Sequence, residues 1–80
     1  MQAKNAIKKL KKFTQNEPEH NNNLIYFTYG KHVIELLVNS EDRVSCVTVM
    51  RKGDKSDAQR DYFAGVSVKN VSQAISLVSN

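Results

Sequence analysis

Hydrophobic positions near the start of the chain recur every three or four residues, whereas those in its middle alternate. In residues 3–13 the apolar positions span about 120° of a helical wheel, and lysines occupy the opposite side. These apolar positions are Ala3, Ala6, Ile7, Leu10 and Phe13. The pattern predicts an amphipathic helix that ends near residues 14–16.

A polar stretch follows at residues 15–23 and contains the only proline of the chain. Its sequence, Gln-Asn-Glu-Pro-Glu-His-Asn-Asn-Asn, is rich in residues that favour turns and loops. We therefore expect a mobile linker between the first helix and the rest of the domain.

Aromatic and β-branched residues then predict an antiparallel sheet over residues 24–67. The first three strands are expected at Leu24–Tyr29, His32–Asn39 and Arg43–Arg51. Gly30-Lys31 suits a type II′ hairpin turn, and Ser40-Glu41-Asp42 forms the second turn. A charged loop over residues 52–57 precedes a fourth strand at Gln59–Ser67, in which Gly65 permits a bulge or bend.

Alternation along the strands predicts which side chains share a face. It places Val44, Cys46, Thr48 and Met50 on one face of the third strand and Ser45, Val47 and Val49 on the other. Four residues are expected on the open face of the sheet or at its edges: Tyr26, Tyr29, His32 and Tyr62.

The C-terminal residues predict a second helix at 70–79. Asn70 is a favourable N-cap, and Gln73 stands three positions later as its capping-box partner. The apolar stripe of this helix consists of Val71, Ala74, Ile75 and Val78. The chain of 80 residues is thus expected to form one α+β domain, 1–80, with both helices on one face of a sheet of three or four strands.

Charge is concentrated in the first helix. Five of the 12 Lys+Arg residues lie there without an acid, at Lys4, Lys8, Lys9, Lys11 and Lys12. The rest of the chain carries 7 Lys+Arg against 8 Asp+Glu, so the net charge of +4 is +5 from the helix and −1 from the remainder. A concentrated basic face can steer an anionic partner, whereas a diffuse one mainly aids solubility.

Composition also bears on the compartment. Cys46 is the only cysteine, so an intramolecular disulfide is excluded, which fits a reducing compartment. The chain contains no apolar run near the ~20 residues that a membrane span needs, and its basic start lacks the hydrophobic region of a signal peptide. We therefore expect a cytoplasmic protein without membrane association.

Residues that could carry catalysis or bind metal are scattered. His20, His32 and Cys46 show no local signature of a nucleophile with its base. The aspartates Asp54, Asp57 and Asp61 lack the ligand pattern of a calcium loop. Neither glycine-rich phosphate-binding pattern occurs. We therefore expect no enzyme activity, no metal and no cofactor.

Residues 49–78 resemble part of a known protein family. The motif consists of Val49-Met50-Arg51, Asp54, Asp57, Asp61-Tyr62-Phe63-Ala64-Gly65, Asn70 and Gln73-Ala74-Ile75. It resembles the C-terminal half of the large polyvalent protein-associated domains found in proteins of phages, plasmids and other mobile elements. The resemblance implies a mobile-element origin and supplies no catalytic residues, and the lysine-rich helix lies outside it.

Three interpretations of the lysine face follow: a solvated surface, a phosphate-binding surface, and a contact with an acidic protein surface. The leading hypothesis is a small non-catalytic protein of a phage or mobile element. It would act as a stoichiometric inhibitor or modulator of a host protein or nucleoprotein complex, with a CRISPR surveillance complex as one target. The alternative is direct nucleic-acid binding by the same lysines together with Arg51, Lys52 and Lys55. A structural module that oligomerises through an edge strand is a third hypothesis.

Overall fold

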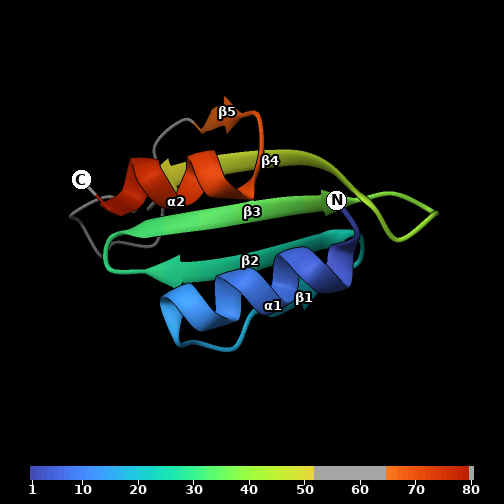
Figure 1. Ribbon diagram of the computed structural model, residues 1–80, viewed down its shortest axis with the longest axis horizontal. Coiled ribbons are helices and arrows are strands. Elements are labelled where there is room, and N and C mark those ends of the chain that lie inside the picture. The colour runs from blue at the N-terminus through green and yellow to red at the C-terminus, as the bar shows by residue number, and fades with distance from the viewer. Residues whose placement is uncertain (52–64, 80) are drawn as a thin grey trace, which may run out of the picture.

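Two helices pack side by side on one face of a five-stranded antiparallel sheet (Figure 1). The computed structural model describes residues 1–51 and 65–79. The elements are α1 (Ala3–Thr14), β1 (Glu19–Asn21), β2 (Leu24–Tyr29), β3 (His32–Val38), β4 (Val44–Arg51), β5 (Val66–Val68) and α2 (Val71–Ser79). The strands lie in the sheet in chain order, so each pairs with its sequence neighbour. The predicted α+β class and the covering of one face by both helices are confirmed.

Helix α1 is held at both ends by backbone hydrogen bonds. The N–H of Ala3 donates to the carbonyl of Asp42 over 2.8 Å, which ties the start of the helix to the turn between β3 and β4. At the other end Gln15 adopts a left-handed conformation, with φ of 58°, and its N–H donates to the carbonyl of Lys11. Such a left-handed residue is a common helix stop because it satisfies a carbonyl that the helix leaves open. The predicted end near residues 14–16 is confirmed.

The polar stretch after α1 contains a strand that the sequence analysis missed. Glu19, His20 and Asn21 pair with Tyr26, Ile25 and Leu24 and form the edge strand β1. All three side chains of β1 are exposed, so the alternation signal of a half-buried strand is absent from its sequence. The sheet therefore has five strands where three or four were expected, and its first strand precedes residue 24.

The core lies between the two helices and the sheet face beneath them. Along that face the register aligns Ile25, Leu36 and Val47 in one row and Phe27, Ile34 and Val49 in the next. The helices contribute Ala6 and Leu10 from α1 and Val71, Ala74 and Val78 from α2. Close packing of these small and large side chains brings α1, α2 and the sheet into one cluster.

A glycine in the turn between β2 and β3 and a bulge between β3 and β4 set the path of the central strands. Gly30 has φ of +60° in the two-residue loop between Tyr29 and His32, as the first position of the predicted type II′ turn requires. A bulge between β3 and β4 pairs Leu37 with Cys46 but Val38 with Val44. At the bulge Ser45 of β4 has no register partner, and as a result Val44 packs against the core. The prediction that Val44 lies on the same face as Cys46 is therefore wrong.

Side chains on the face of the sheet opposite the helices differ widely in how exposed they are. Leu37 on this face is 39% exposed, whereas Val33 is 3% exposed. Tyr26 lies there as predicted, in a row with Glu35 and Thr48.

Two residues that were expected on this face or its edges lie elsewhere. Tyr29 and His32 are register partners in the row beyond Phe27 and Ile34, on the face that the helices cover, and Tyr29 packs against the core. The register of β2 with β3 is regular up to Tyr29 and His32, so alternation within β2 places Tyr29 on the same face as Phe27 and opposite to Tyr26. Tyr62 lies outside the residues that the structure describes.

The fourth predicted strand coincides only at its end with a described strand. Val66–Val68 form β5, which pairs with Val49 to Val47 of β4, while residues 59–64 lie outside the described part of the chain. Gly65 lies directly against Thr48 and Met50, where a Cβ atom would collide with the Thr48 side chain. A side chain larger than hydrogen does not fit there.

Helix α2 begins with the predicted cap. The side-chain oxygen of Asn70 accepts a hydrogen bond from the N–H of Gln73 at 2.8 Å. The Gln73 side chain reaches back to the N–H of Lys69 at 2.6 Å, one residue before the partner that a capping box would give it. Val71, Ala74 and Val78 are buried and Ile75 is half-buried, so the predicted apolar stripe is confirmed.

Candidate binding surface

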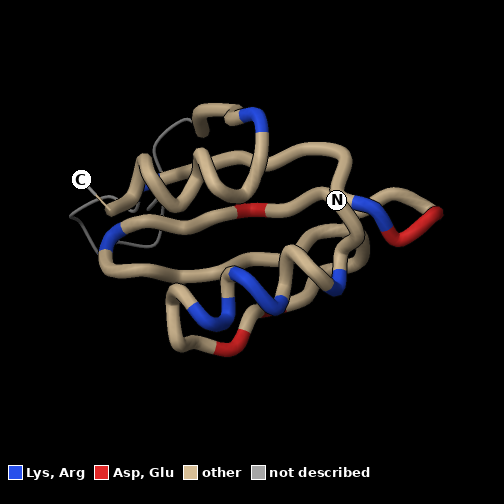
Figure 2. Tube along the Cα trace, in the orientation of Figure 1, with Lys and Arg blue, Asp and Glu red and all other residues tan. Residues whose placement is uncertain are grey.

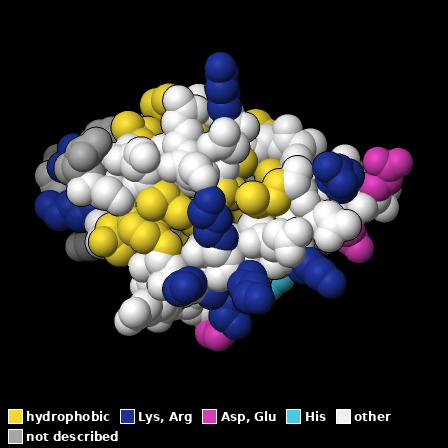
Figure 3. Space-filling view, viewed as in Figure 1, with side chains coloured by type: hydrophobic (Ala, Val, Ile, Leu, Met, Phe, Trp, Pro, Cys, Tyr) yellow, Lys and Arg dark blue, Asp and Glu magenta, His cyan; other side chains and the backbone are white. Residues whose placement is uncertain are grey.

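All five lysines of α1 are exposed, on the side of the helix that faces away from the core. At 100° per residue, Lys4, Lys8, Lys11 and Lys12 fall within an arc of about 100°, and Lys9 lies about 60° further round. Lysine and arginine side chains stand out as separate blue projections in Figure 3. The structure therefore brings together all five lysines that were selected from the sequence.

This arrangement of lysines lowers the stability of the helix that carries it. Lys4–Lys8 and Lys8–Lys12 are like-charge pairs at i,i+4, and each such pair costs about 0.2–0.5 kcal/mol. The first turn of α1 contains Lys4 and no acid, so the helix dipole also disfavours the charge there. Lys11 and Lys12 are in the last turn, where the dipole favours them. Helix stability thus does not explain Lys4 and Lys8.

Lys9 differs from the other four because it lies beside α2. Its Nζ donates a hydrogen bond of 2.5 Å to the Oγ of Ser72 in the first turn of α2. Close by on the same side of α1, the ring of Phe13 packs against that of Tyr29, with centroids 4.5 Å apart and planes tilted by 33°. Ile75 of α2 is half-buried on the flank that also carries Ser72.

We define the interhelical seam as Lys9 and Phe13 of α1, Ser72 and Ile75 of α2, and Tyr29 at its end. Figure 3 shows hydrophobic side chains gathered between the two helices, with lysines beside them. Three members of the seam, Phe13, Tyr29 and Ile75, are hydrophobic residues that the core covers only in part. Sequence reasoning assigned Phe13 and Ile75 to the core-facing stripes of their helices and Tyr29 to the open face of the sheet or its edges, and it did not separate Lys9 from the other lysines.

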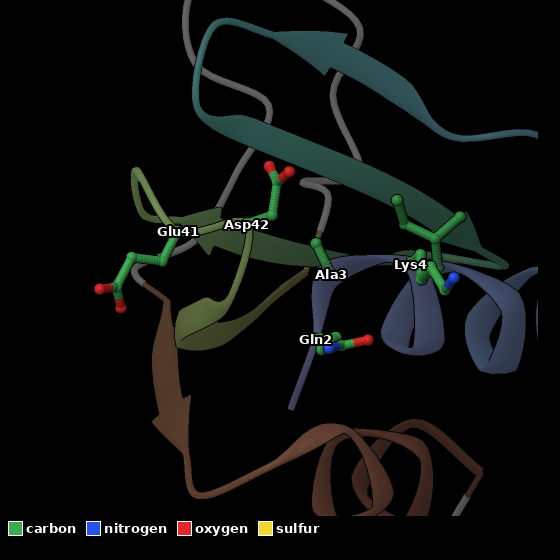
Figure 4. Close-up of a pocket in the computed structure, with 6 residues that line it drawn as sticks. Gln2, Ala3, Lys4, Glu41 and Asp42 are labelled. Carbon is green, nitrogen blue, oxygen red and sulfur yellow. The ribbon is translucent and has the colours of Figure 1, made fainter.

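The opposite flank of α1 borders two cavities that contain acidic groups. A cavity of about 390 Å³ is lined by Lys4, Ile7, Glu41 and Asp42, together with Gln2 and Ala3 (Figure 4). In Figure 4 the Glu41 carboxylate points away from α1, and Asp42 stands between Glu41 and the helix. A neighbouring cavity of about 290 Å³ adds His20 of β1 to Ala3, Ile7 and Asp42. On this flank Lys11 pairs with Glu17 at 3.2 Å, in an exposed ion pair of little energetic weight.

Charge is therefore distributed unevenly around α1. On the β1 side, Lys11 pairs with Glu17 and Lys4 lines the same cavity as two acids, whereas Lys8 and Lys12 have no polar partner within the part of the chain that the structure describes. Helix α2 contains no charged residue in its sequence. Among residues 1–51 and 65–79, every acid lies outside the two helices, at Glu17, Glu19, Glu35, Glu41 and Asp42 (Figure 2). All charged side chains of α1 and α2 are therefore lysines.

The additional basic residues chosen from the sequence are only partly placed. Arg51 ends β4 and lines a hollow of about 450 Å³ with Tyr29, Lys31, His32 and Val78. Tyr29 connects this hollow to the seam, because its ring also packs on Phe13. Lys52 and Lys55 lie outside the residues that the structure describes.

The residues with catalytic potential are not brought together. Cys46 is half-buried on the face opposite the helices, with its Sγ 3.7 Å from the Oγ1 of Thr48. His20 is exposed in β1, and His32 lies in the row that the helices cover. Within residues 1–51 and 65–79, no group of three His, Cys, Asp or Glu side chains is placed to hold a metal ion.

Over the same residues, both helices are too short to cross a membrane.

Comparisons with family models, with curated proteins and with solved structures return no match to this chain.

Proposed function

We propose that this chain is a non-catalytic binding protein that contacts an acidic protein surface through Lys8, Lys9 and Lys12. The observation that carries the proposal is the concentration of positive charge on one helix. Five lysines and no acid lie on α1, while the described acids lie at loops, on the edge strand and on the opposite face. Lys8 and Lys12 repel each other at i,i+4 and have no polar partner among the described residues, so both are available to an anionic partner, and Lys9 lies beside them at the start of α2.

The seam favours a protein partner over the alternative of direct nucleic-acid binding. A protein that binds bases of single strands needs aromatic rings with a free face for stacking. Among the described residues, Phe13 follows Lys12 directly on α1, and its ring packs on that of Tyr29. Apolar side chains beside lysines instead match protein interfaces, where a hydrophobic centre is bordered by charged groups.

The biological setting that we propose is stoichiometric inhibition or modulation of a host protein or nucleoprotein complex. It is supported by the resemblance of residues 49–78 to domains of phage and mobile-element proteins. In this setting the lysine face occludes an acidic surface of the target, and a CRISPR surveillance complex is one such target.

An affinity capture from a lysate of the host organism tests the proposal. The unaltered chain is compared with the triple variant Lys8→Glu, Lys9→Glu and Lys12→Glu, with and without nuclease, and bound proteins are identified by mass spectrometry. A matched control reverses three basic residues outside α1, Lys31, Arg43 and Lys69, so that both variants change the net charge from +4 to 4 − 6 = −2.

We expect a defined set of proteins that survives nuclease treatment, is retained by the control and is lost from the α1 triple variant. Equal capture by the α1 triple variant would remove the lysine face from the mechanism. Loss of the captured proteins on nuclease treatment would favour the nucleic-acid alternative. That alternative also predicts binding to naked DNA or RNA with affinity that falls steeply as salt increases.

A further inference from the structure

We infer that the partner segment is an acidic amphipathic helix that lies along the interhelical seam. This inference rests on the proposed function and specifies its ligand. The seam combines the cations of α1 with two features that a lysine face alone lacks: half-buried apolar side chains and an uncharged α2 wall.

The apolar part of the seam supplies a place for hydrophobic anchors. Phe13, Tyr29 and Ile75 are each half-buried against the core, so each leaves part of its hydrocarbon surface in contact with water. Covering such surface stabilises a complex by roughly 25 cal/mol per Å² of apolar area removed from water. A ligand that is only charged, such as a polyphosphate, gains nothing from these residues.

Charge complementarity determines the polar side of the ligand. Lys9 lies at the seam, and Lys12 lies next to it on the exposed side of α1. No acid from α1 or α2 competes with a bound carboxylate, because neither helix contains one. A ligand with Asp or Glu along one side and apolar residues along the other satisfies both parts of the surface at once.

The parallel arrangement of α1 and α2 favours a helical ligand. Both helices run in the same direction over the sheet (Figure 1), and a third helix can lie over the line where they meet, with anchors at i and i+3 or i+4. The part of α1 in the seam runs from Lys9 to Phe13, which at 1.5 Å per residue is about 6 Å. A ligand helix therefore contacts the seam through one to two of its turns.

Binding of a designed peptide tests the inference on the intact chain. The probe is a synthetic peptide of three heptads with leucine at the a and d positions and glutamate on the outer positions. A scrambled peptide of the same composition and polyglutamate are the comparison ligands. Binding to ¹⁵N-labelled protein is followed by amide shifts and by calorimetry. We expect the amphipathic peptide to bind at least about tenfold more tightly than the scrambled one, with the largest shifts around Phe13, Ser72 and Ile75.

Two variants of α2 with the same change in charge localise the site. Ser72→Glu places a carboxylate in the seam next to Lys9, at a helix start where a negative charge is favourable for folding. Leu77 is 43% exposed and lies on the flank of α2 away from α1, so Leu77→Glu is the matched control. We expect Ser72→Glu to weaken peptide binding about tenfold and Leu77→Glu to change it less than twofold.

The possible outcomes separate this inference from the proposed function. If the scrambled peptide and polyglutamate bind as tightly as the amphipathic peptide, and reversal of Lys8, Lys9 and Lys12 abolishes binding, the seam inference is overturned and the lysine contact stands. If acidic ligands bind equally to the lysine triple variant, both are overturned. Absence of peptide binding overturns the inference, as does peptide binding that is weaker than binding to phosphatidylserine-containing vesicles or to single-stranded RNA through the same residues.

Discussion

Replacing Lys8 with glutamate should stabilise the fold and at the same time remove part of the binding surface. Lys8 is exposed and stands one turn from Lys4 and one turn from Lys12, so it takes part in two repulsive i,i+4 pairs. Glutamate at this position converts both pairs into attractive ones. Each pair contributes about 0.2–0.5 kcal/mol in either sense, so the two conversions sum to about 0.8–2 kcal/mol.

The expected net change is near the lower end of that range. The pair between Lys4 and a glutamate at position 8 has the less favourable order along the helix, and salt screens both pairs. We therefore expect the free energy of unfolding to rise by about 1 kcal/mol at low salt. With an m value of about 1 kcal/mol per molar for a small domain, the urea midpoint shifts upward by about 1 M.

Urea unfolding followed by circular dichroism measures this change, because urea, unlike guanidinium, leaves the ionic strength unaltered. Lys8→Gln is the matched control, since it removes the repulsion without adding attraction and should give about half of the gain. The gain of Lys8→Glu should also shrink as sodium chloride is added. A midpoint equal to or below that of the unaltered chain would refute the reasoning that these lysines strain α1. An identical gain for glutamine and glutamate would refute its electrostatic part.

Three further predictions concern the scaffold beneath the surface. Leu10→Ala removes a fully buried side chain and should lower the free energy of unfolding by about 3–5 kcal/mol, enough to unfold most of the protein, as the loss of amide dispersion in NMR spectra would show. Asn70→Ala removes the cap of α2 and should cost about 1 kcal/mol in urea unfolding, whereas Asn70→Asp should retain most of it. Gly65→Ala should be destabilised by contact with Thr48, and adding Thr48→Ser, which removes the colliding methyl group, should restore part of the lost melting temperature. An unchanged melting temperature for Gly65→Ala would contradict the tight approach of Gly65 to β4.

Local patterns in the sequence determined most of the elements. The apolar period in residues 3–13 fixed α1 because Leu10 and its neighbours recur on one face, and this period depends only on helical geometry. Gly30 and Asn70 marked a turn and a helix start because their conformations or side chains suit those positions whatever surrounds them. The lysine face was likewise evident, since charges that follow the helical period must lie opposite the apolar stripe.

Pairing between distant segments decided the rest. Strand β1 forms because Glu19–Asn21 pair with the start of β2. All three of its side chains are exposed, so its sequence has no burial pattern from which a strand could be predicted. The bulge that turns Val44 toward the core arises from the register between β3 and β4, which neither strand's own alternation contains. Tertiary packing also distinguishes Lys9 from the other four lysines. Lys9 contacts Ser72, 63 positions later in the chain, only because the sheet places α1 and α2 side by side. Periodicity assigns a residue to a face of its own element, whereas packing alone determines which other element that face meets.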